Sequence, residues 1–141
     1  MKKPSKCAVH EISHALVAKG LGCKIKEVCL IDEETGYAES AIRKENGLPY
    51  DKVIISSISI AGWVSEILWF GADENYFPDD DLRSLQKIGT TGIGVALIRV
   101  EVEKYLKMNK KLIFTLAREL DKKKRLTGRM ISRIVNKENK G

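Results

Sequence analysis

The 141-residue sequence predicts a mainly α-helical domain with a small β-hairpin or short sheet after its first helix. Apolar residues recur at helical spacing through most of the chain, whereas one early segment alternates apolar and charged side chains as a strand does. A chain of this length with 43% hydrophobic residues is able to bury one core. We therefore expect a single domain over residues 1–141.

The first predicted helix covers residues 5–19 and stops at Gly20. The segment CKIKEVCLI, residues 23–31, then alternates apolar and charged side chains, which is typical of a strand. The turn DEETG follows, and YAESAI is expected to return as a second short strand. These residues are the predicted β-hairpin.

A long apolar helix is predicted next, capped by Asp51 and ending near Gly71. Its stretch 53–70 contains only one charged residue, Glu66, so it has to be distinguished from a membrane span. Four serines, Gly62 and Glu66 make it too polar and too short for a good transmembrane helix. We expect a buried core helix and no membrane span.

The rest of the chain is predicted as helices separated by turn residues. They are a short helix from near Asp81 interrupted at 89–92, one over about 93–108, one from Asn109 to Lys124, and a final short helix capped by Thr127.

The candidate metal site is the pentapeptide His10-Glu11-Ile12-Ser13-His14, which fits the zinc-peptidase pattern H-E-x-x-H. Residues four apart lie one above the other on a helix, so His10 and His14 can present two imidazoles to one ion. Glu11 lies about 100° further around the helix, where it flanks a bound water as a general base instead of acting as a ligand. The chain has no other histidine, which argues against a chance occurrence.

A third ligand has to come from elsewhere, because a catalytic zinc site uses three protein ligands and a water. Glu66 is one candidate, since a lone carboxylate in an apolar helix is costly unless it is paired or binds metal. The acidic run Asp79–Asp81 is another, and Cys7, on the same helix face as His10, is interpreted as a packed thiol. The residues alone leave Glu66 and the acidic run open.

The net charge of +6 is concentrated near the two ends of the chain, where lysine-rich runs are interpreted as solvated helix faces. No aromatic residues interleave with these lysines, so nucleic-acid binding is not expected. Three cysteines without C-x-x-C spacing indicate reduced thiols, and the N-terminal region lacks a secretory signal core. These features predict a cytoplasmic location.

Several motifs in order resemble the peptidase domain of the FtsH-type ATP-dependent zinc metalloprotease family. AVHEISHALVA, from Ala8, is similar to the family pattern A-x-H-E-A-G-H-A, and AGWVSEILWFG, residues 61–71, is similar to G-G-R-A-A-E-E-x-x-F-G. DDDL at 79–82 stands where the family has S-N-D-[LI]. The C-terminal part follows the family's helix, helix, Leu-Thr/Asp-Gly, short-helix ending, so the resemblance covers nearly the whole chain.

The resemblance implies zinc as the cofactor, with His10, His14 and Asp81 as ligands and Glu11 as the catalytic base. It gives Glu66 a supporting place beside the site, behind Asp81 as a candidate ligand. It also implies a zinc metalloendopeptidase that hydrolyses unfolded or flexible polypeptides, with an edge strand near residues 37–42 as a place for an extended substrate. No phosphate-loop motif occurs in these residues, so we expect a stand-alone peptidase chain without an ATPase module, with a separate ATPase or a homo-oligomer as open alternatives for partners.

Three departures from the family pattern support an alternative. Ser13 replaces a smaller residue inside the zinc motif, Trp63 stands where an arginine is common, and the Pro-Arg-Gly turn is missing before Gly36-Tyr37, which the family shares. The alternative is a catalytically weak or inactive peptidase-like module that keeps the fold, and zinc, for binding or regulation.

Overall fold

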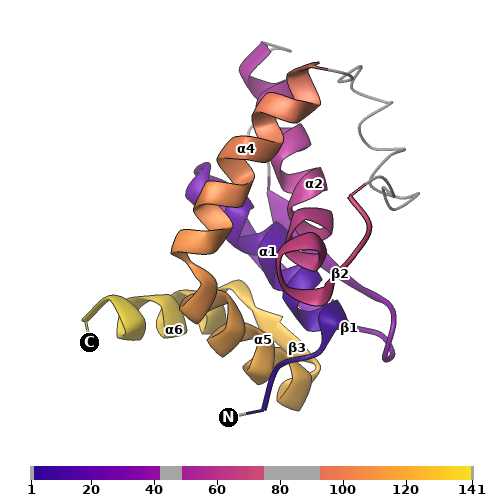
Figure 1. The fold of residues 1–141 in the computed structure, drawn as a ribbon. Helices are drawn as coiled ribbons and strands as arrows, with labels where there is room; N and C mark the ends of the chain where they lie inside the picture. Colours follow the sequence, from indigo (N-terminus) through magenta and orange to yellow (C-terminus); the bar gives the residue numbers. More distant parts are fainter. Residues whose placement is uncertain (1, 42–48, 75–92, 141) are drawn as a thin grey trace.

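The computed structural model describes residues 2–41, 49–74 and 93–140 (Figure 1). Within them the chain is mainly helical, with a small antiparallel sheet after the first helix, as predicted. The elements are α1 (Lys6–Gly20), β1 (Lys24–Leu30), β2 (Gly36–Ala41), α2 (Pro49–Phe70), α4 (Ile93–Met108), α5 (Lys110–Lys123), β3 (Arg125–Thr127) and α6 (Gly128–Lys140).

The sheet has the strand order β2-β1-β3, with Val28 of β1 paired to Ala38 on one side and to Leu126 on the other. The hairpin of β1 and β2 confirms the sequence prediction. The third strand was not predicted, because three residues are too few to show an alternating pattern. It joins the C-terminal part of the chain to the N-terminal hairpin.

Helix α1 is central: it packs against α2, α5 and the strands β1 and β2 (Figure 1). Ile12 and Leu16 of α1 are buried in the same core as Val28 of β1 and Leu116 of α5. Since the sheet and α2 both contact α1, the residues of α1 are held from both sides. This is the helix that carries the two histidines.

The start of α1 is capped by Ser5, whose Oγ accepts a hydrogen bond from the backbone N–H of Ala8 at 3.1 Å. Gly20 is the last helical residue, so the helix runs one residue further than predicted. A Cβ at Gly20 would lie 2.8 Å from the Tyr105 hydroxyl, which donates to the carbonyl of Leu16 at 2.9 Å. The absence of a side chain at Gly20 therefore lets α4 approach α1.

Helix α2 begins at Pro49, so the prediction of Asp51 as its cap was wrong. Proline is favoured in the first turn, because its fixed φ suits a helix and its missing N–H has no intrahelical acceptor there. Asp51 lies inside the first turn instead.

Within the described ranges one stretch, Val53–Phe70 of α2, is long and apolar enough to cross a membrane by length and composition alone. Half of that stretch is buried inside the protein, against α1 and α4. The core helix of a soluble protein meets the same criteria, so the prediction of no membrane span stays a prediction.

The last two helices start differently from each other. Thr127 caps α6 as predicted, because its Oγ1 accepts from the backbone N–H of Met130 at 3.2 Å. Asn109 precedes α5 as predicted but makes no side-chain cap; its Nδ2 donates to the Tyr105 carbonyl of α4 at 2.8 Å. The short helix expected near Asp81 lies outside the described residues.

Candidate metal centre

His10 and His14 face each other one turn apart on α1, with their Nε2 atoms 3.0 Å apart and their ring centroids 4.7 Å apart. Both side chains are partly buried between α1 and α2. The arrangement is the one that the i, i+4 spacing predicts.

Each histidine is oriented by an acceptor on α2. The Nδ1 of His10 lies 2.9 Å from Oε2 of Glu66, and the Nδ1 of His14 contacts the backbone carbonyl of Ile58. A carbonyl oxygen only accepts, so His14 carries its proton on Nδ1, and the carboxylate of Glu66 favours the same tautomer for His10. Both Nε2 lone pairs then point toward one another, an arrangement that a shared proton or a metal cation stabilises.

His14 is in the protonation state that metal binding requires. Burial lowers its pKa from 6.5 to about 4, and the neighbouring imidazole of His10 acts in the same direction. His14 is therefore neutral at pH 7, and a neutral imidazole is the form that binds a metal ion.

Glu66 is a charged partner of His10 on the side of the ring away from Nε2. Its partial burial raises the pKa of the carboxyl, but His10 and Lys6 outweigh this and bring the net pKa below the ordinary value. The Nζ of Lys6 lies 3.7 Å from Oε1 of Glu66. Of the two roles considered for Glu66, this geometry favours the supporting one, an acceptor that orients a ligating histidine.

Glu11 completes the cluster. It is only 6% exposed, and one of its carboxylate oxygens and one ring nitrogen each of His10 and His14 all lie within 4.8 Å of one another. The start of β2 lies over it, since a Cβ at Gly36 would be 3.2 Å from Cγ of Glu11. His10, Glu11 and His14 are thus close enough together to bind a metal ion.

Gly62 of α2 is a site residue that the sequence analysis did not identify. A Cβ at Gly62 would lie 2.4 Å from Nε2 and Cε1 of His10, so only glycine lets the imidazole lie against the α2 backbone. A signal for it was present, because a glycine inside a helix costs about 1 kcal/mol relative to alanine and so calls for a packing reason.

The residues that depart from the family pattern are accommodated in the core. Ser13 is fully buried, and its Oγ has no hydrogen-bond partner among the described residues. Trp63 is 6% exposed, with the guanidinium of Arg99 5.0 Å from its ring.

Cys7 packs beside the core, and burial raises the pKa of its thiol to about 11, as expected for a packed thiol.

Asp81, the third ligand that the resemblance implies, lies outside the described residues together with Asp79 and Asp80. The described part of the chain thus supplies two imidazoles, a carboxylate beside them and the acceptors that orient both rings. No protein-family model matches the sequence, and a search among curated proteins finds no significant match.

Proposed function

We propose that the protein is a zinc-dependent metallopeptidase similar to the peptidase domain of the FtsH-type family. The observation that carries this proposal is the pairing of His10 and His14 through Nε2 while their Nδ1 atoms contact acceptors on another helix. Ligating histidines in metalloproteins usually have such an outer acceptor. If the two histidines occurred on the helix by chance, we would not expect each of them to have an acceptor on α2 at its Nδ1 atom.

The donor set suits zinc. Imidazole nitrogens suit zinc and other transition metals, whereas magnesium and calcium prefer oxygen ligands. Two nitrogens that each lie about 2.0–2.1 Å from a tetrahedral ion are about 3.3 Å apart. The Nε2 atoms of His10 and His14 are 3.0 Å apart, so a small rotation of either ring brings them to that spacing.

In this proposal each residue has one task. His10 and His14 hold the ion, while Glu66 and the Ile58 carbonyl fix the orientation of the two rings. A bound zinc ion supplies the Lewis acidity that activates a water and polarises a peptide carbonyl. Glu11 takes the proton from the attacking water and passes it to the amine of the cleaved bond.

The substrates we propose are unfolded or flexible polypeptides. Strand β2 is an outer strand in the order β2-β1-β3, and its first residue, Gly36, lies against Glu11. An extended chain that pairs with the outer edge of β2 would pass close to the carboxylate of Glu11. Main-chain pairing of this kind tolerates many sequences, which suits an unfolded substrate.

Replacement of Glu11 by Gln tests the proposal. The amide keeps the size of the side chain but does not accept a proton, so we expect normal zinc content and a loss of at least 100-fold in the hydrolysis of unfolded casein. The exposed Glu101→Gln on α4 is the matched control and should cleave casein at the wild-type rate. Equal rates for Glu11→Gln and wild type would sink the assignment of Glu11.

Elemental analysis of purified variants tests the ligand set. We expect Asp81→Ala to lose most of its zinc, because it removes the third ligand that the resemblance implies. Glu66→Ala should retain zinc at saturation but bind it roughly 10- to 100-fold more weakly, as expected for an outer acceptor. The reverse pattern, with zinc retained by Asp81→Ala and lost by Glu66→Ala, would make Glu66 the ligand.

The alternative, a module that binds without cleaving, is favoured by the burial of Glu11, since a catalytic base has to reach its water. Peptide hydrolysis with zinc added back separates the two functions. A protein that holds zinc in stoichiometric amount, binds unfolded casein and leaves it intact would be the binding module.

A further inference from the structure

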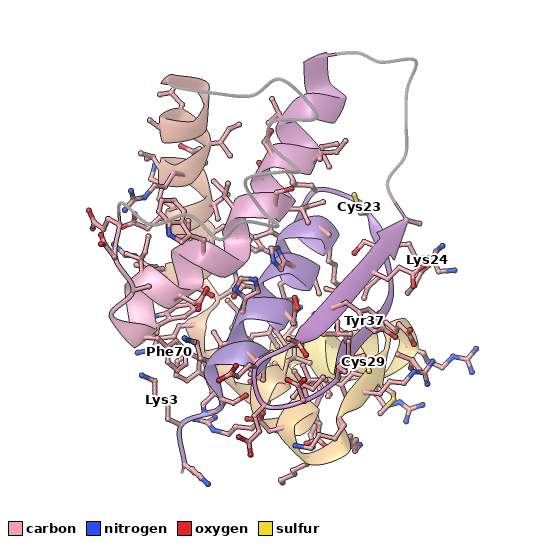
Figure 2. The ribbon with its side chains drawn as sticks, turned by 90° about the vertical axis from the view of Figure 1, so that its right-hand side faces the viewer. Lys3, Cys23, Lys24, Cys29, Tyr37 and Phe70 are labelled. Carbon is pink, nitrogen blue, oxygen red and sulfur yellow. The ribbon has the colours of Figure 1, made fainter. Side chains whose placement is uncertain are left out.

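A second feature, outside the metal centre, is an open pocket of about 680 Å³ where α1, β1 and α6 meet. We call it the basic pocket. Among the described residues its wall contains four cationic side chains, Lys19, Lys24, Lys26 and Arg129, and no carboxylate. Two hydroxyl side chains, Thr127 and Ser132, also line it. Figure 2 shows the exposed Lys24 at the periphery of the molecule.

The fold brings these cations together from distant parts of the sequence. Strand β3 pairs only with Glu27–Cys29, so the first half of β1 extends beyond the end of β3. There the first turn of α6 lies on β1: a Cβ at Gly128 would be 1.9 Å from the carbonyl oxygen of Ile25. This close approach places Arg129 beside the lysines of β1.

Most of the positive charges of the basic pocket have no acidic partner in the part of the chain that the structure describes. Lys26 forms an ion pair with Glu39 at 3.5 Å, with both side chains more than half exposed. In the described ranges Lys19, Lys24 and Arg129 have no ion pair. Like charges around one concave surface repel, and such a surface attracts and concentrates anions.

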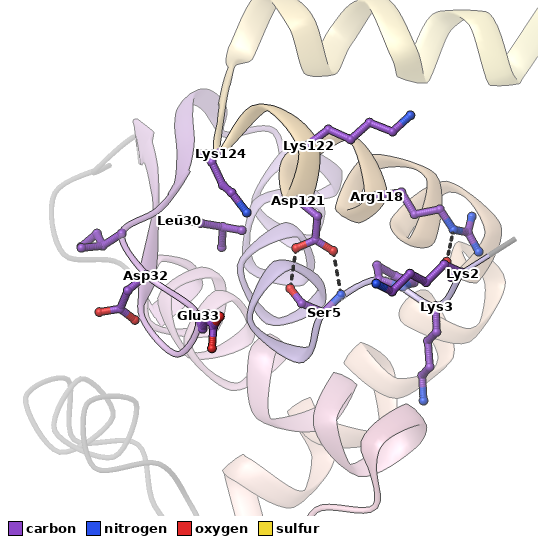
Figure 3. A pocket seen from close by; sticks show the side chains of 12 residues that line it. Lys2, Lys3, Ser5, Leu30, Asp32, Glu33, Arg118, Asp121, Lys122 and Lys124 are labelled. Atoms are coloured by element: carbon purple, nitrogen blue, oxygen red, sulfur yellow. Dashed lines mark hydrogen bonds between the residues drawn. The ribbon is translucent and has the colours of Figure 1, made fainter.

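A second pocket, at the other end of β1, shows that a surface without carboxylates is not a general property of a basic protein. The larger pocket of about 1200 Å³ in Figure 3 is lined by five cationic residues, but Asp32, Glu33 and Asp121 lie among them. Asp121 there accepts hydrogen bonds from the backbone N–H and the hydroxyl of Ser5, at 2.7 and 2.6 Å. Carboxylates line that pocket, whereas none of the described residues that line the basic pocket is acidic.

We infer that the basic pocket binds a compact anion that carries two or more phosphate groups. Four cations match the charge of a di- or triphosphate, and a volume near 680 Å³ lies in the usual range for small-ligand sites. The guanidinium of Arg129 suits two phosphate oxygens at once, and lysines bind phosphate as point charges. An acidic peptide carries about one charge per 3.3 Å of extended chain, so it spreads the same charge over a longer path.

Calorimetric titration with sodium tripolyphosphate at low salt tests this inference. We expect binding to the wild-type protein and at least a tenfold loss of affinity in Lys24→Gln/Arg129→Gln. The matched control is Lys2→Gln/Lys122→Gln, which removes two charges from the larger pocket and should bind within twofold of wild type. If circular dichroism shows that Lys24→Gln/Arg129→Gln does not fold, Lys19→Gln/Lys24→Gln, which leaves α6 intact, takes its place.

Equal losses in the two double variants would overturn the inference, because only net charge would then matter. An absence of tripolyphosphate binding to the wild type, or equally tight binding of a tetraglutamate peptide, would also overturn it. A second arm uses phosphatidylcholine vesicles with and without phosphatidylinositol bisphosphate. Binding to the phosphoinositide vesicles that Lys24→Gln/Arg129→Gln abolishes identifies a lipid headgroup as the source of the phosphates; tripolyphosphate binding without vesicle binding identifies a soluble one.

Discussion

Two acceptor atoms on α2 determine the tautomer and the orientation of each histidine ring of α1. Glu66 and the carbonyl of Ile58 lie 56 and 44 residues away from the histidines they contact. Each occupies the Nδ1 side of a ring and leaves Nε2 facing inward. Without these two acceptors each ring could adopt either tautomer. The two Nε2 atoms would then have no fixed position relative to each other.

Gly62→Ala should damage the centre although alanine is the better helix former. The added methyl would lie 2.4 Å from the ring of His10, so the imidazole has to leave the position in which its Nε2 lies 3.0 Å from that of His14. We expect zinc affinity, measured by competition with a chelating dye, to fall at least tenfold. Ser57→Ala, elsewhere on α2, loses only a bond from its Oγ to the Val53 carbonyl and should keep wild-type affinity. Wild-type affinity in Gly62→Ala would show that the ring is not held against α2.

Among the elements, β3 and α6 depend on the rest of the fold more than on their own sequence. β3 exists only as a partner of β1, to which it brings Leu126, a fully buried residue, opposite Val28. Arg125 strengthens this pairing, because its Nε donates to the carboxylate of Glu27 at 2.6 Å. The cap at Thr127 then sets where the strand ends and α6 begins.

Thr127→Ala should lower the free energy of unfolding by about 1 kcal/mol, the usual contribution of a threonine cap. Urea denaturation measures the change. The control is Thr115→Ala, since Thr115 lies inside α5 and its hydroxyl only donates back to the Lys111 carbonyl; a change within about 0.5 kcal/mol is expected there. Equal effects of the two substitutions would mean that the cap at α6 contributes nothing.

For the whole molecule, the central place of α1 couples the candidate metal centre to global stability. The helix lies between the sheet and α2, so the histidines are partly buried by the same contacts that form the core. A change in the protonation of His14 is therefore a change in the stability of the entire fold.

The metal-free protein should become less stable as the pH falls from about 6.5 to about 4. The native state lowers the pKa of His14 to about 4 from 6.5, so the unfolded state binds a proton first in this range. Stability is fully present above pH 6.5, and up to about 3 kcal/mol is lost on the way to pH 4. Urea denaturation in the presence of a chelator measures it. In His14→Gln the dependence over this range should be much flatter, and an unchanged slope would contradict the role of His14.

The sequence alone determined the local features. The spacing of His10, Glu11 and His14 specifies their relation on any helix, the alternation of residues 23–31 predicts β1, and Thr127 marks the start of α6. These predictions depend only on helix and strand geometry and on short-range hydrogen bonds, so they did not need the fold. That Asp81 is the third ligand stays a prediction, which rests on the resemblance alone.

Tertiary structure decided the contacts between segments distant in sequence. It showed that Glu66 contacts Nδ1 of His10, that Gly62 makes room for the ring, and that Gly128 brings Arg129 to β1. None of these is visible in local pattern, because each depends on how closely two packed elements approach one another. Spacing along one helix puts two imidazoles on the same face, but only the packing of α2 onto α1 determines which nitrogens they present to a metal ion.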